Sequence, residues 1–277
     1  MNLPFRVKLD GRVAVVTGGS GVLCSRFAMA LAACGARVAI LGRTLEKGER
    51  VAREIGNGAI ALQADVMDKA SLLRARETLL GLYGPPDILI NGAGGNDPAA
   101  TTQDEQFDLA AQGVRDFFSL DAEGIRGVMD LNYLGTLLPT QVFARDMAGR
   151  PGACIINISS MGAYLPLTKV MAYSGAKAAV SNFTQWLATY FARSGIRVNA
   201  IAPGFFVGEQ NRSLLFDAQG RPTPRTGKIL AATPMGRFGE PEELIGALLF
   251  LVSPEASGFV TGAVIPVDGG YSAYSGV

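Results

Sequence analysis

Short apolar runs alternate with longer amphipathic stretches along most of this chain. The apolar runs are rich in Val, Ile, Ala and Leu, which is typical of strands covered on both faces. We expect strands at Val13–Thr17, Arg37–Leu41, Ala59–Gln63, Ile88–Asn91, Ala153–Ile158, Arg197–Ile201 and Val264–Val267. The stretches between them predict helices at Ser25–Cys34, Leu45–Ile55, Lys69–Tyr83, Ala172–Ser194 and Glu240–Val252. This alternation predicts an α/β fold of Rossmann type: a doubly wound parallel sheet of about seven strands with helices on both faces.

Two long irregular segments, Asn96–Gly127 and Phe205–Thr233, interrupt the alternation. Each follows the carboxyl end of a predicted strand, where open α/β sheets bind their ligands. No repeat or linker divides the 277 residues. We therefore expect a single domain over residues 1–277, with 1–11 as an N-terminal arm and with 96–127 and 205–233 as substrate-side insertions.

The composition narrows the range of partners. A net charge of +1 gives no field that would attract nucleic acid or an anionic membrane. Charged residues make up 18% of the chain, against about 25% in typical soluble proteins. That shortage favours a homo-oligomer with buried subunit contacts over a core-rich monomer. The N-terminus lacks an apolar signal core, and no apolar run approaches the roughly 18 residues that span a bilayer. We expect a soluble cytoplasmic protein with no membrane partner.

The chain has no histidine, which excludes every catalytic role and metal site built on that residue. Acid–base chemistry near neutral pH must then use Tyr, Lys, Cys, Asp or Glu. The three cysteines, Cys24, Cys34 and Cys154, lack the spacing of zinc ligands. We expect reduced, buried thiols and no metal site.

The first predicted strand runs through a glycine-rich turn directly into a helix. Such a turn lets the backbone approach a pyrophosphate, and the helix start presents free N–H groups to it. The residues expected to bind a dinucleotide here are Gly18, Gly19, Ser20, Gly21, Val22 and Leu23. After the second strand, where NAD-binding proteins carry an acid, stand Arg43 and Thr44. Arg43 either pairs with a 2′-phosphate or is an exposed residue at a helix start. We favour NADP(H), with NAD(H) as the alternative.

Two further strand ends complete the expected dinucleotide site. Asp65, followed by Val66, either touches the adenine or caps the helix that comes next. Small residues end the fourth strand and let a cofactor lie over it; the four residues are Asn91, Gly92, Ala93 and Gly94.

Tyr173 and Lys177 lie four residues apart near the start of a long predicted helix, and therefore on one face of it. A phenol with a pKa near 10 is a poor catalyst at neutral pH. A nearby ammonium group and an oxidised nicotinamide would favour the phenolate. Ser160, which closes the fifth strand, could hold the substrate oxygen beside Tyr173. The pattern predicts an oxidoreductase that moves a hydride to or from an alcohol carbon, with Tyr173 as proton donor.

Over nearly its whole length the chain resembles the short-chain dehydrogenase/reductase family. The matching motifs are VVTGGSG, ILINGAG, DLNYLGT, IINISSM, AYSGAKAAV, GIRVNAIAPG and FVTGAVIPVDGG. The resemblance implies a catalytic tetrad of Asn132, Ser160, Tyr173 and Lys177. In it, Lys177 binds the nicotinamide ribose and lowers the pKa of Tyr173, and Asn132 holds a water of the proton relay.

The same resemblance extends to the cofactor and to the assembly. It implies that Pro203 and Gly204 pack near the nicotinamide and that the backbone around Phe206 reaches its carboxamide. It also implies a tetramer in which the helix carrying Trp186 packs against another subunit. Two departures stand out: Val22 and Cys24 occupy the last two glycine positions of the family's TGxxxGxG motif, and Gly208 replaces the threonine after the PG motif.

Within the family, GVLC, INGAGGN, PLTK and APGFF-EQNR resemble a sub-group named D-mannonate oxidoreductase or fructuronate reductase. This implies reduction of D-fructuronate to D-mannonate. Groups suited to a polyhydroxylated, anionic substrate are Asn96, Lys169, Gln210, Asn211 and Arg212, beside Ser160. Either Lys169 or Arg212 would bind the carboxylate. Two alternatives stay open: a reductase of a 3-oxoacyl thioester or a ketose, and a dinucleotide-binding regulator without turnover.

Overall fold

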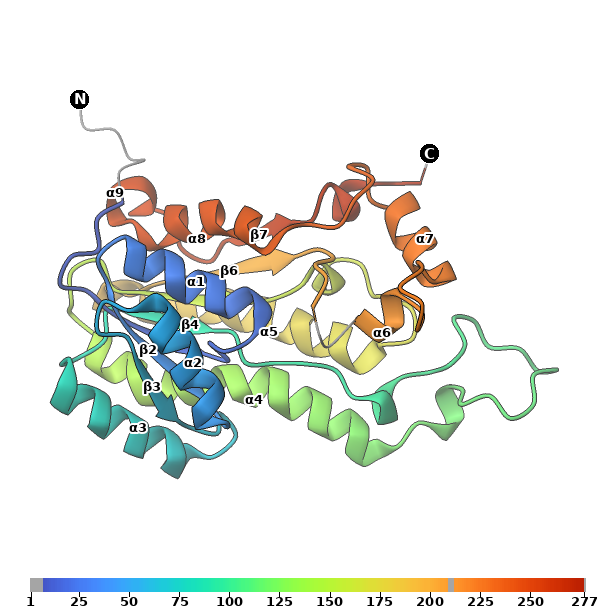
Figure 1. Cartoon of the computed structure of the whole chain (residues 1–277), viewed down its shortest axis with the longest axis horizontal. Coiled ribbons are helices and arrows are strands. Elements are labelled where there is room, and N and C mark those ends of the chain that lie inside the picture. The colour runs from blue at the N-terminus through green and yellow to red at the C-terminus, as the bar shows by residue number, and fades with distance from the viewer. Residues whose placement is uncertain (1–6, 209–211, 277) are drawn as a thin grey trace.

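Seven parallel strands form the centre of the protein in the computed structural model, which describes residues 7–208 and 212–276 (Figure 1). Their order is β3-β2-β1-β4-β5-β6-β7. The strands are β1 Val13–Thr17, β2 Arg37–Gly42, β3 Ile60–Gln63, β4 Ile88–Asn91, β5 Cys154–Ile158, β6 Arg197–Pro203 and β7 Val264–Val267. The chain leaves β1 toward β3 and then returns to place β4 beside β1, so the winding reverses between these two strands. The predicted fold class is confirmed, and each strand lies within two residues of its predicted bounds.

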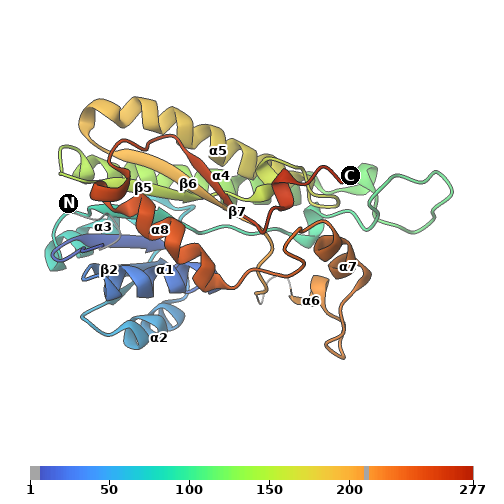
Figure 2. The ribbon, with the colours of Figure 1, turned by 90° about the horizontal axis from the view of Figure 1, so that it is seen from above.

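Helices cover both faces of the sheet, as Figure 2 shows from above. Alternate residues of each strand point to opposite faces and build two separate cores. One face packs against α1 Val22–Ala33, α2 Leu45–Ile55 and α8 Ile245–Val252. The other packs against α3 Lys69–Leu82, α4 Ala122–Met147 and α5 Met171–Phe191. The shorter helices are α6 Arg212–Leu215, α7 Pro224–Ala231 and α9 Pro254–Ser257.

Several helix ends differ from the prediction. The first irregular segment ends at Asp121, not at Gly127, because the Asp121 side chain accepts a hydrogen bond from the Gly124 amide and starts α4. The sequence pattern did not reveal this helix start, because glycines at 124 and 127 have low helix propensity and weaken the helical pattern. The last predicted helix is a 3-10 turn, Pro241–Leu244, followed by α8.

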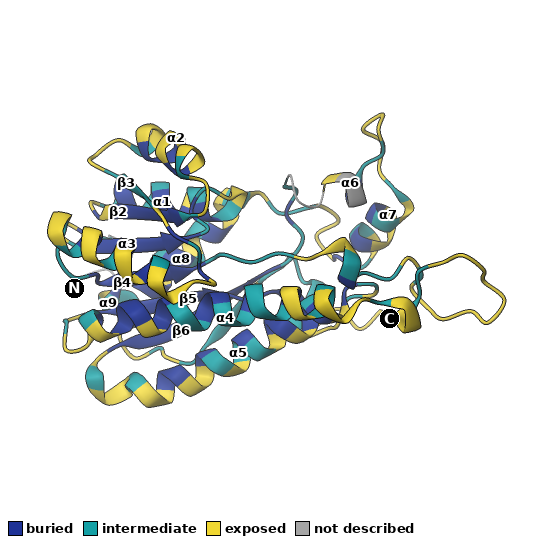
Figure 3. Ribbon diagram, turned by 90° about the horizontal axis from the view of Figure 1, so that it is seen from below, coloured by how far each residue is buried: buried dark blue, intermediate teal, exposed yellow. Residues whose placement is uncertain are grey.

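Both insertions extend from the edge of the sheet formed by the carboxyl ends of the strands (Figure 1). Figure 3 shows that the segment before α4 is exposed along most of its length, whereas β1, β4, β5 and β6 are buried. The two insertions meet through an ion pair, in which Lys228 Nζ lies 2.6 Å from Glu105 Oε2. The two insertions therefore lie together over the carboxyl edge of the sheet, where the winding reverses between β1 and β4.

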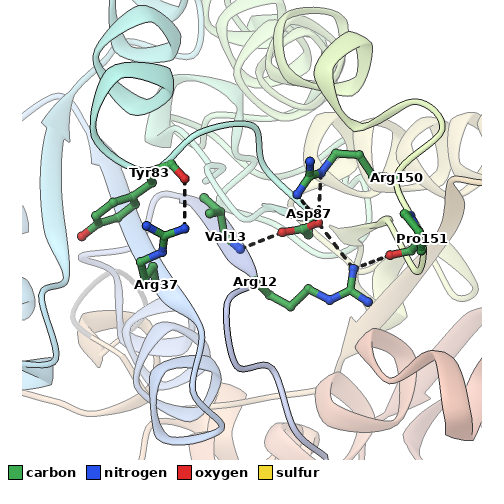
Figure 4. Close-up of polar contacts among 7 residues, drawn as sticks. All are labelled: Arg12, Val13, Arg37, Tyr83, Asp87, Arg150 and Pro151. Atoms are coloured by element: carbon green, nitrogen blue, oxygen red, sulfur yellow. Dashed lines mark hydrogen bonds and ion pairs between the residues drawn. The ribbon is translucent and has the colours of Figure 1, made fainter.

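The opposite edge of the sheet is closed by a cluster of charges around Asp87 (Figure 4). The Asp87 side chain, 4% exposed, accepts hydrogen bonds from the Val13 amide at 2.9 Å and from Arg150 Nε at 3.0 Å. Arg12 Nη1 lies 3.4 Å from the same carboxylate and also donates to the carbonyl of Pro151. The start of β1, the residue before β4 and the loop before β5 are thereby held together.

The described residues contain neither a membrane-spanning helix nor a cluster of metal ligands. None of their helices is both long and apolar enough to cross a membrane. In the same residues, no three side chains of the types His, Cys, Asp and Glu gather where they could hold a metal ion.

Candidate active site

The turn between β1 and α1 forms a cradle with almost no side-chain bulk. Gly18 has φ +63°, a conformation that side chains disfavour, and a Cβ there would lie 2.9 Å from the backbone of Ala93. Helix α1 begins after Gly21, which offers no side-chain cap, so its first amides are not capped by a side chain. The Thr17 hydroxyl accepts from the amides of Gly92 and Ala93, which fixes the end of β4 against this turn. The predicted turn residues and strand-end residues are thus brought together.

Cys24 fills the third glycine position of the family motif, and the space for it comes from Gly92. A Cβ on Gly92 would lie 2.1 Å from Cys24 Sγ, so no side chain fits at position 92 while the thiol is present. Burial raises the pKa of this thiol to about 12, against an opposing effect of the Lys177 charge. The altered motif is therefore accommodated by a matching glycine on β4, and the thiol stays neutral.

Gly94 marks the point where two predicted catalytic side chains converge. A Cβ at this position would lie 2.6 Å from Asn132 Oδ1 and 3.2 Å from Lys177 Nζ. Asn132 is fully buried, and its amide donates to the carbonyls of Gly95 at 2.7 Å and Val128 at 2.8 Å. Asn132 thus joins α4 to the loop after β4. Its amide nitrogen makes both of these hydrogen bonds with backbone carbonyl groups.

Lys177 is a buried cation on α5, 5% exposed. Its Nζ donates to the carbonyl of Ile158, the last residue of β5, at 2.8 Å. It lies 5.6 Å from the centre of the Tyr173 ring. Burial lowers the pKa of Lys177 to about 8, with a small opposing effect of Cys24. The group is therefore still charged at neutral pH but close to its titration range.

Tyr173 and Ser160 complete the predicted tetrad. Ser160 is 6% exposed, and its hydroxyl oxygen accepts from the Gly162 amide at 3.1 Å, which leaves its own proton available. Burial raises the pKa of Tyr173, and a hydrogen bond with Ser160 opposes that rise. The sequence predicted a lowered phenol pKa through Lys177 and an oxidised nicotinamide together. In the protein alone the phenol keeps its proton more strongly than usual.

Pro203 is the last residue of β6, and Gly204, predicted to pack near the nicotinamide, follows it at the carboxyl edge of the sheet. A Cβ on Gly204 would lie 2.6 Å from Asp268 Cα, and the Gly204 amide donates to the carbonyl of Val267. Phe206 is buried and forms a β-bridge with Gly239. Asp268, which sequence reasoning missed, accepts from the amides of Gly270 and Ser272 and so orders the C-terminal segment. Its DGG context, a turn signal, could have revealed it.

The remaining predicted dinucleotide residues lie along the same edge. Arg43 and Thr44 are exposed at the end of β2, and Thr44 precedes α2 without a side-chain cap. Asp65 does not cap α3, because that position belongs to Asp68; its Oδ1 accepts from the Met67 amide instead. Val66 is buried, and a Cβ on Gly135 of α4 would lie 3.0 Å from it.

The predicted substrate residues divide into three cases. Lys169 lines a cavity of about 350 Å³ between the two insertions. Asn96 is exposed and donates to Thr101 Oγ1, a neighbour of that cavity. Arg212 is exposed, lies 5.5 Å from the centre of the Phe216 ring, and is not among the residues that line the cavity. Gln210 and Asn211 lie outside the described residues.

Two cations of α7, Arg225 and Lys228, share the cavity with Lys169, and sequence reasoning missed them. The Thr223-Pro224 pair is a helix-start signal, and a spacing of three residues places both cations on one helix face. A slightly larger cavity, about 370 Å³, lies near Phe206 and Asp268; like the first cavity, it is lined by no residue of the tetrad.

The arrangement fits a nucleotide cofactor, since a glycine cradle and an uncapped helix start lie on the same edge as a buried cation and a phenol.

Matches to known proteins support an oxidoreductase that binds such a cofactor. The family model for short-chain dehydrogenases matches residues 12–215. An uncharacterized oxidoreductase of Haemophilus influenzae is 56% identical over 282 residues, with 100% of this chain and 99% of that protein covered. Galactitol 2-dehydrogenase (L-tagatose-forming) of Cereibacter sphaeroides is 35% identical, with 96% and 97% covered.

A solved structure shares the whole architecture. It is that of a candidate D-mannonate oxidoreductase from Haemophilus influenzae with bound NAD, which superimposes with a TM-score of 0.94 at 55% identity. The alignment covers 100% of both chains. The family match over more than half of the chain, together with these relatives, confirms the resemblance. The chain belongs to the short-chain dehydrogenase family and is an oxidoreductase.

Proposed function

We propose that this protein is an NAD(P)-dependent oxidoreductase that interconverts a secondary alcohol and a ketone on a sugar acid, in a reaction of the D-fructuronate to D-mannonate type. One observation carries the proposal. Asn132 and Lys177 meet over Gly94, and on the same helix–strand junction the Ser160 hydroxyl lies close enough to Tyr173 to oppose the rise in the pKa of that phenol. A proton donor, a carbonyl-orienting hydroxyl and a cation thereby gather at one end of the nucleotide cradle.

The bound cofactor supplies the hydride that the carbonyl carbon accepts. The Ser160 hydroxyl, whose oxygen accepts from the Gly162 amide, turns its proton from Tyr173 to the substrate, donates a hydrogen bond to the carbonyl oxygen and fixes its position. The Tyr173 hydroxyl donates its proton to that oxygen as negative charge develops on it. The raised pKa of Tyr173 keeps the donor protonated at neutral pH, which suits the reductive direction. In the oxidative direction the phenolate must form, so positive charge nearby has to lower that pKa.

Lys177 supplies part of that positive charge. Its Nζ is held by the Ile158 carbonyl rather than neutralised by a carboxylate, so its charge acts undiminished on the site. We propose that it also binds the nicotinamide ribose. Asn132 fixes the Gly94–Gly95 loop, and we propose that a relay water lies against this junction, although the amide nitrogen itself is already bonded to the backbone.

The sugar-acid substrate is supported by the polar and cationic character of the insertions. Lys169, Arg225 and Lys228 line the cavity between them. A 3-oxoacyl thioester would favour an apolar entrance instead. The names of two relatives agree with this substrate class, since one is a candidate D-mannonate oxidoreductase and another is a galactitol 2-dehydrogenase.

Both nicotinamide cofactors fit the proposal, with NADP(H) preferred. Arg43 is exposed just beyond β2, where it can pair with a 2′-phosphate. The Haemophilus influenzae structure contains NAD, so acceptance of NAD(H) is also part of the proposal.

A panel of substrates tests the function. Purified protein is mixed with NADH or NADPH and with D-fructuronate, D-tagaturonate, D-fructose or a 3-oxoacyl thioester, and the loss of reduced cofactor is followed by absorbance. We expect turnover with a keto-hexuronate and a higher kcat/KM with NADPH. Turnover of the thioester alone would refute the substrate assignment. Equal kcat/KM values with both cofactors would refute the role of Arg43.

We also propose that the protein is a tetramer assembled partly through α5. Trp186 and Tyr190 on this helix are 56% and 66% exposed, and their rings stack with centroids 4.8 Å apart. Large exposed aromatic pairs are typical of interface cores. Sedimentation analysis of the wild type and of a Trp186→Lys variant should give a tetramer and a smaller species, whereas a wild-type monomer would refute the assembly.

A further inference from the structure

The cavity of about 350 Å³ between the insertions joins three separate parts of the chain. Thr101 and Glu105 come from the first insertion, Lys169 and Val170 from the residues before α5, and the others from the start of α7. Val170 lies three residues before Tyr173. Ala100, next to Thr101, packs in the same cluster as the Tyr173 ring. The cavity therefore borders the turn of α5 that carries the proton donor.

The charges in this cavity are unbalanced. Lys169, Arg225 and Lys228 line it together with one acid, Glu105, so three positive charges less one negative charge leave a net +2. The Glu105 pKa is held below its usual value, first by the hydrogen bond from Lys228 and also by the charges of Lys169 and Arg225. All three cations thus lie within electrostatic reach of one carboxylate. The cavity already holds one carboxylate, and its remaining net positive charge favours the binding of a second carboxylate.

Lys169 is held in this place by a constrained backbone. It has φ +74°, in the left-handed region that non-glycine residues rarely adopt, and its carbonyl accepts from the Thr102 amide at 3.0 Å. Such strain persists where the surrounding structure fixes it, and it is concentrated at ligand sites. The first insertion therefore fixes the backbone of a lysine that lines the cavity.

On the side lined by Arg225, the cavity lies near the segment that we expect to contact the nicotinamide. Arg225 lies close enough to Tyr271 for its charge to lower the pKa of that phenol, against the larger rise caused by burial. The Tyr271 ring packs edge-on against Phe205, with centroids 5.3 Å apart, and Phe205 follows Pro203-Gly204 directly. Val170 thus connects the cavity to the Tyr173 helix, and Arg225 lies within electrostatic reach of a residue that packs next to the PG segment.

We propose that this cationic pocket, lined by Lys169, Arg225 and Lys228, binds the carboxylate of the substrate, with Glu105 as the internal counter-ion that the incoming carboxylate competes with. The proposal rests on the proposed function and makes it more specific, because it adds two cations that had no role. A sugar acid bound in this way would direct the rest of its carbon chain toward Tyr173, so that anionic substrates are selected over neutral polyols.

Calorimetric titration of the protein loaded with reduced cofactor, which cannot accept a hydride from D-mannonate, tests the pocket without turnover. The probes are D-mannonate and its neutral counterpart D-mannitol. We expect Arg225→Met and Lys228→Met each to weaken D-mannonate binding by about tenfold or more, as for loss of a charge-assisted contact, and to leave D-mannitol binding unchanged. Lys228→Arg should restore much of the affinity. Affinities for D-mannonate that do not change in either Met variant would overturn the proposal.

Glu105→Gln separates anion binding from a purely structural link between the insertions. If the pocket binds a carboxylate, removal of the competing charge should strengthen D-mannonate binding, opposite in sign to Lys228→Met. If the Lys228–Glu105 pair only ties the insertions together, both variants should weaken binding alike, which would overturn the proposal. Failure of the proposed function shows separately: no keto-hexuronate is turned over, while charge-dependent D-mannonate binding persists.

Discussion

The two edges of the sheet handle charge in opposite ways. At the amino-terminal edge, the buried carboxylate of Asp87 is matched by two guanidinium groups and a backbone amide (Figure 4). At the carboxyl edge, the buried ammonium of Lys177 has a backbone carbonyl as its partner. The first arrangement is compensated internally and holds three chain segments together. The second leaves a charge directed at the place where a ligand would lie.

The contrast separates stabilising groups from reactive ones. A buried charge that is fully paired helps to hold the fold together. Removing its partner leaves the charge buried without compensation, which destabilises the fold. A buried charge without an opposite charge has a shifted pKa, and shifted pKa values gather at functional sites. Substitutions at one edge should therefore change stability, whereas those at the other should change rate.

The largest effect is expected for Tyr173→Phe. The change removes the proton donor and keeps the ring, so turnover should fall by about 10³-fold, the range of general acid catalysis. Steady-state kinetics measure this, and fluorescence titration with reduced cofactor should show nearly unchanged affinity. A variant with more than a tenth of wild-type turnover would show that another group donates the proton.

Asp87→Ala should produce the opposite pattern. The two arginines and the Val13 amide lose their shared partner, which should lower the free energy of unfolding by about 3 kcal/mol. Glu242→Ala is the matched control, because its pair with Arg26 is at the surface, so its loss should change stability little. Urea unfolding measures both. A loss of kcat in folded Asp87→Ala protein, without a loss of stability, would contradict the division between the edges.

Gly92→Ala probes the fit between β4 and α1. The new methyl group would collide with Cys24 Sγ, so stability should fall by about 2 kcal/mol, as in other overpacked cores. Cys24→Ala removes the sulfur, and in the double variant most of this loss should disappear. Additive losses in thermal melts of the single and double variants would show that the two positions are not coupled.

The smallest effect is expected in the pH profile. With the pKa of Lys177 near 8, the ammonium loses its proton as the pH rises through that value. Reductive kcat/KM should then fall by about tenfold between pH 7 and pH 9, as for a single titrating group. The Tyr173 pKa is raised, so the proton donor does not titrate in this range. A flat profile up to pH 10 would contradict a role for the Lys177 charge.

Unfolding cannot explain that decline. The unfolded chain keeps the lysine proton up to the usual value of 10.5, so it binds more protons than the native state between pH 8 and 10.5. The contribution of this group to stability therefore rises with pH in that window. Thermal melts at pH 7.5 and pH 8.5, below the usual value of 9.0 at which the Cys24 thiol ionises in the unfolded chain, serve as the control.

The sequence was most informative where local pattern determines structure. Continuous apolar runs located all seven strands, because strands buried on both faces admit few other residues. The i, i+4 spacing of Tyr173 and Lys177 placed them on one helix face, and the structure puts them there. The family motifs added Asn132 and Ser160.

Contacts between distant segments were beyond the sequence. Arg12 and Arg150 lie 75 and 63 positions from Asp87, and nothing local joins them. Glu105 and Lys228 are 123 positions apart, so the cationic pocket appears only once the insertions are placed. Cys24 could be noted as a departure from the motif, but its partner Gly92 looked like an ordinary small residue at a strand end. Pairings of this kind depend on the tertiary packing.

A crystal structure of the protein with cofactor and D-mannonate would test the central claim most directly. The account predicts the hydroxyls of Tyr173 and Ser160 within hydrogen-bond distance of one substrate oxygen, with Lys177 Nζ at the nicotinamide ribose. A Tyr173 hydroxyl turned away from the bound cofactor, with no room for a carbonyl beside it, would contradict the account.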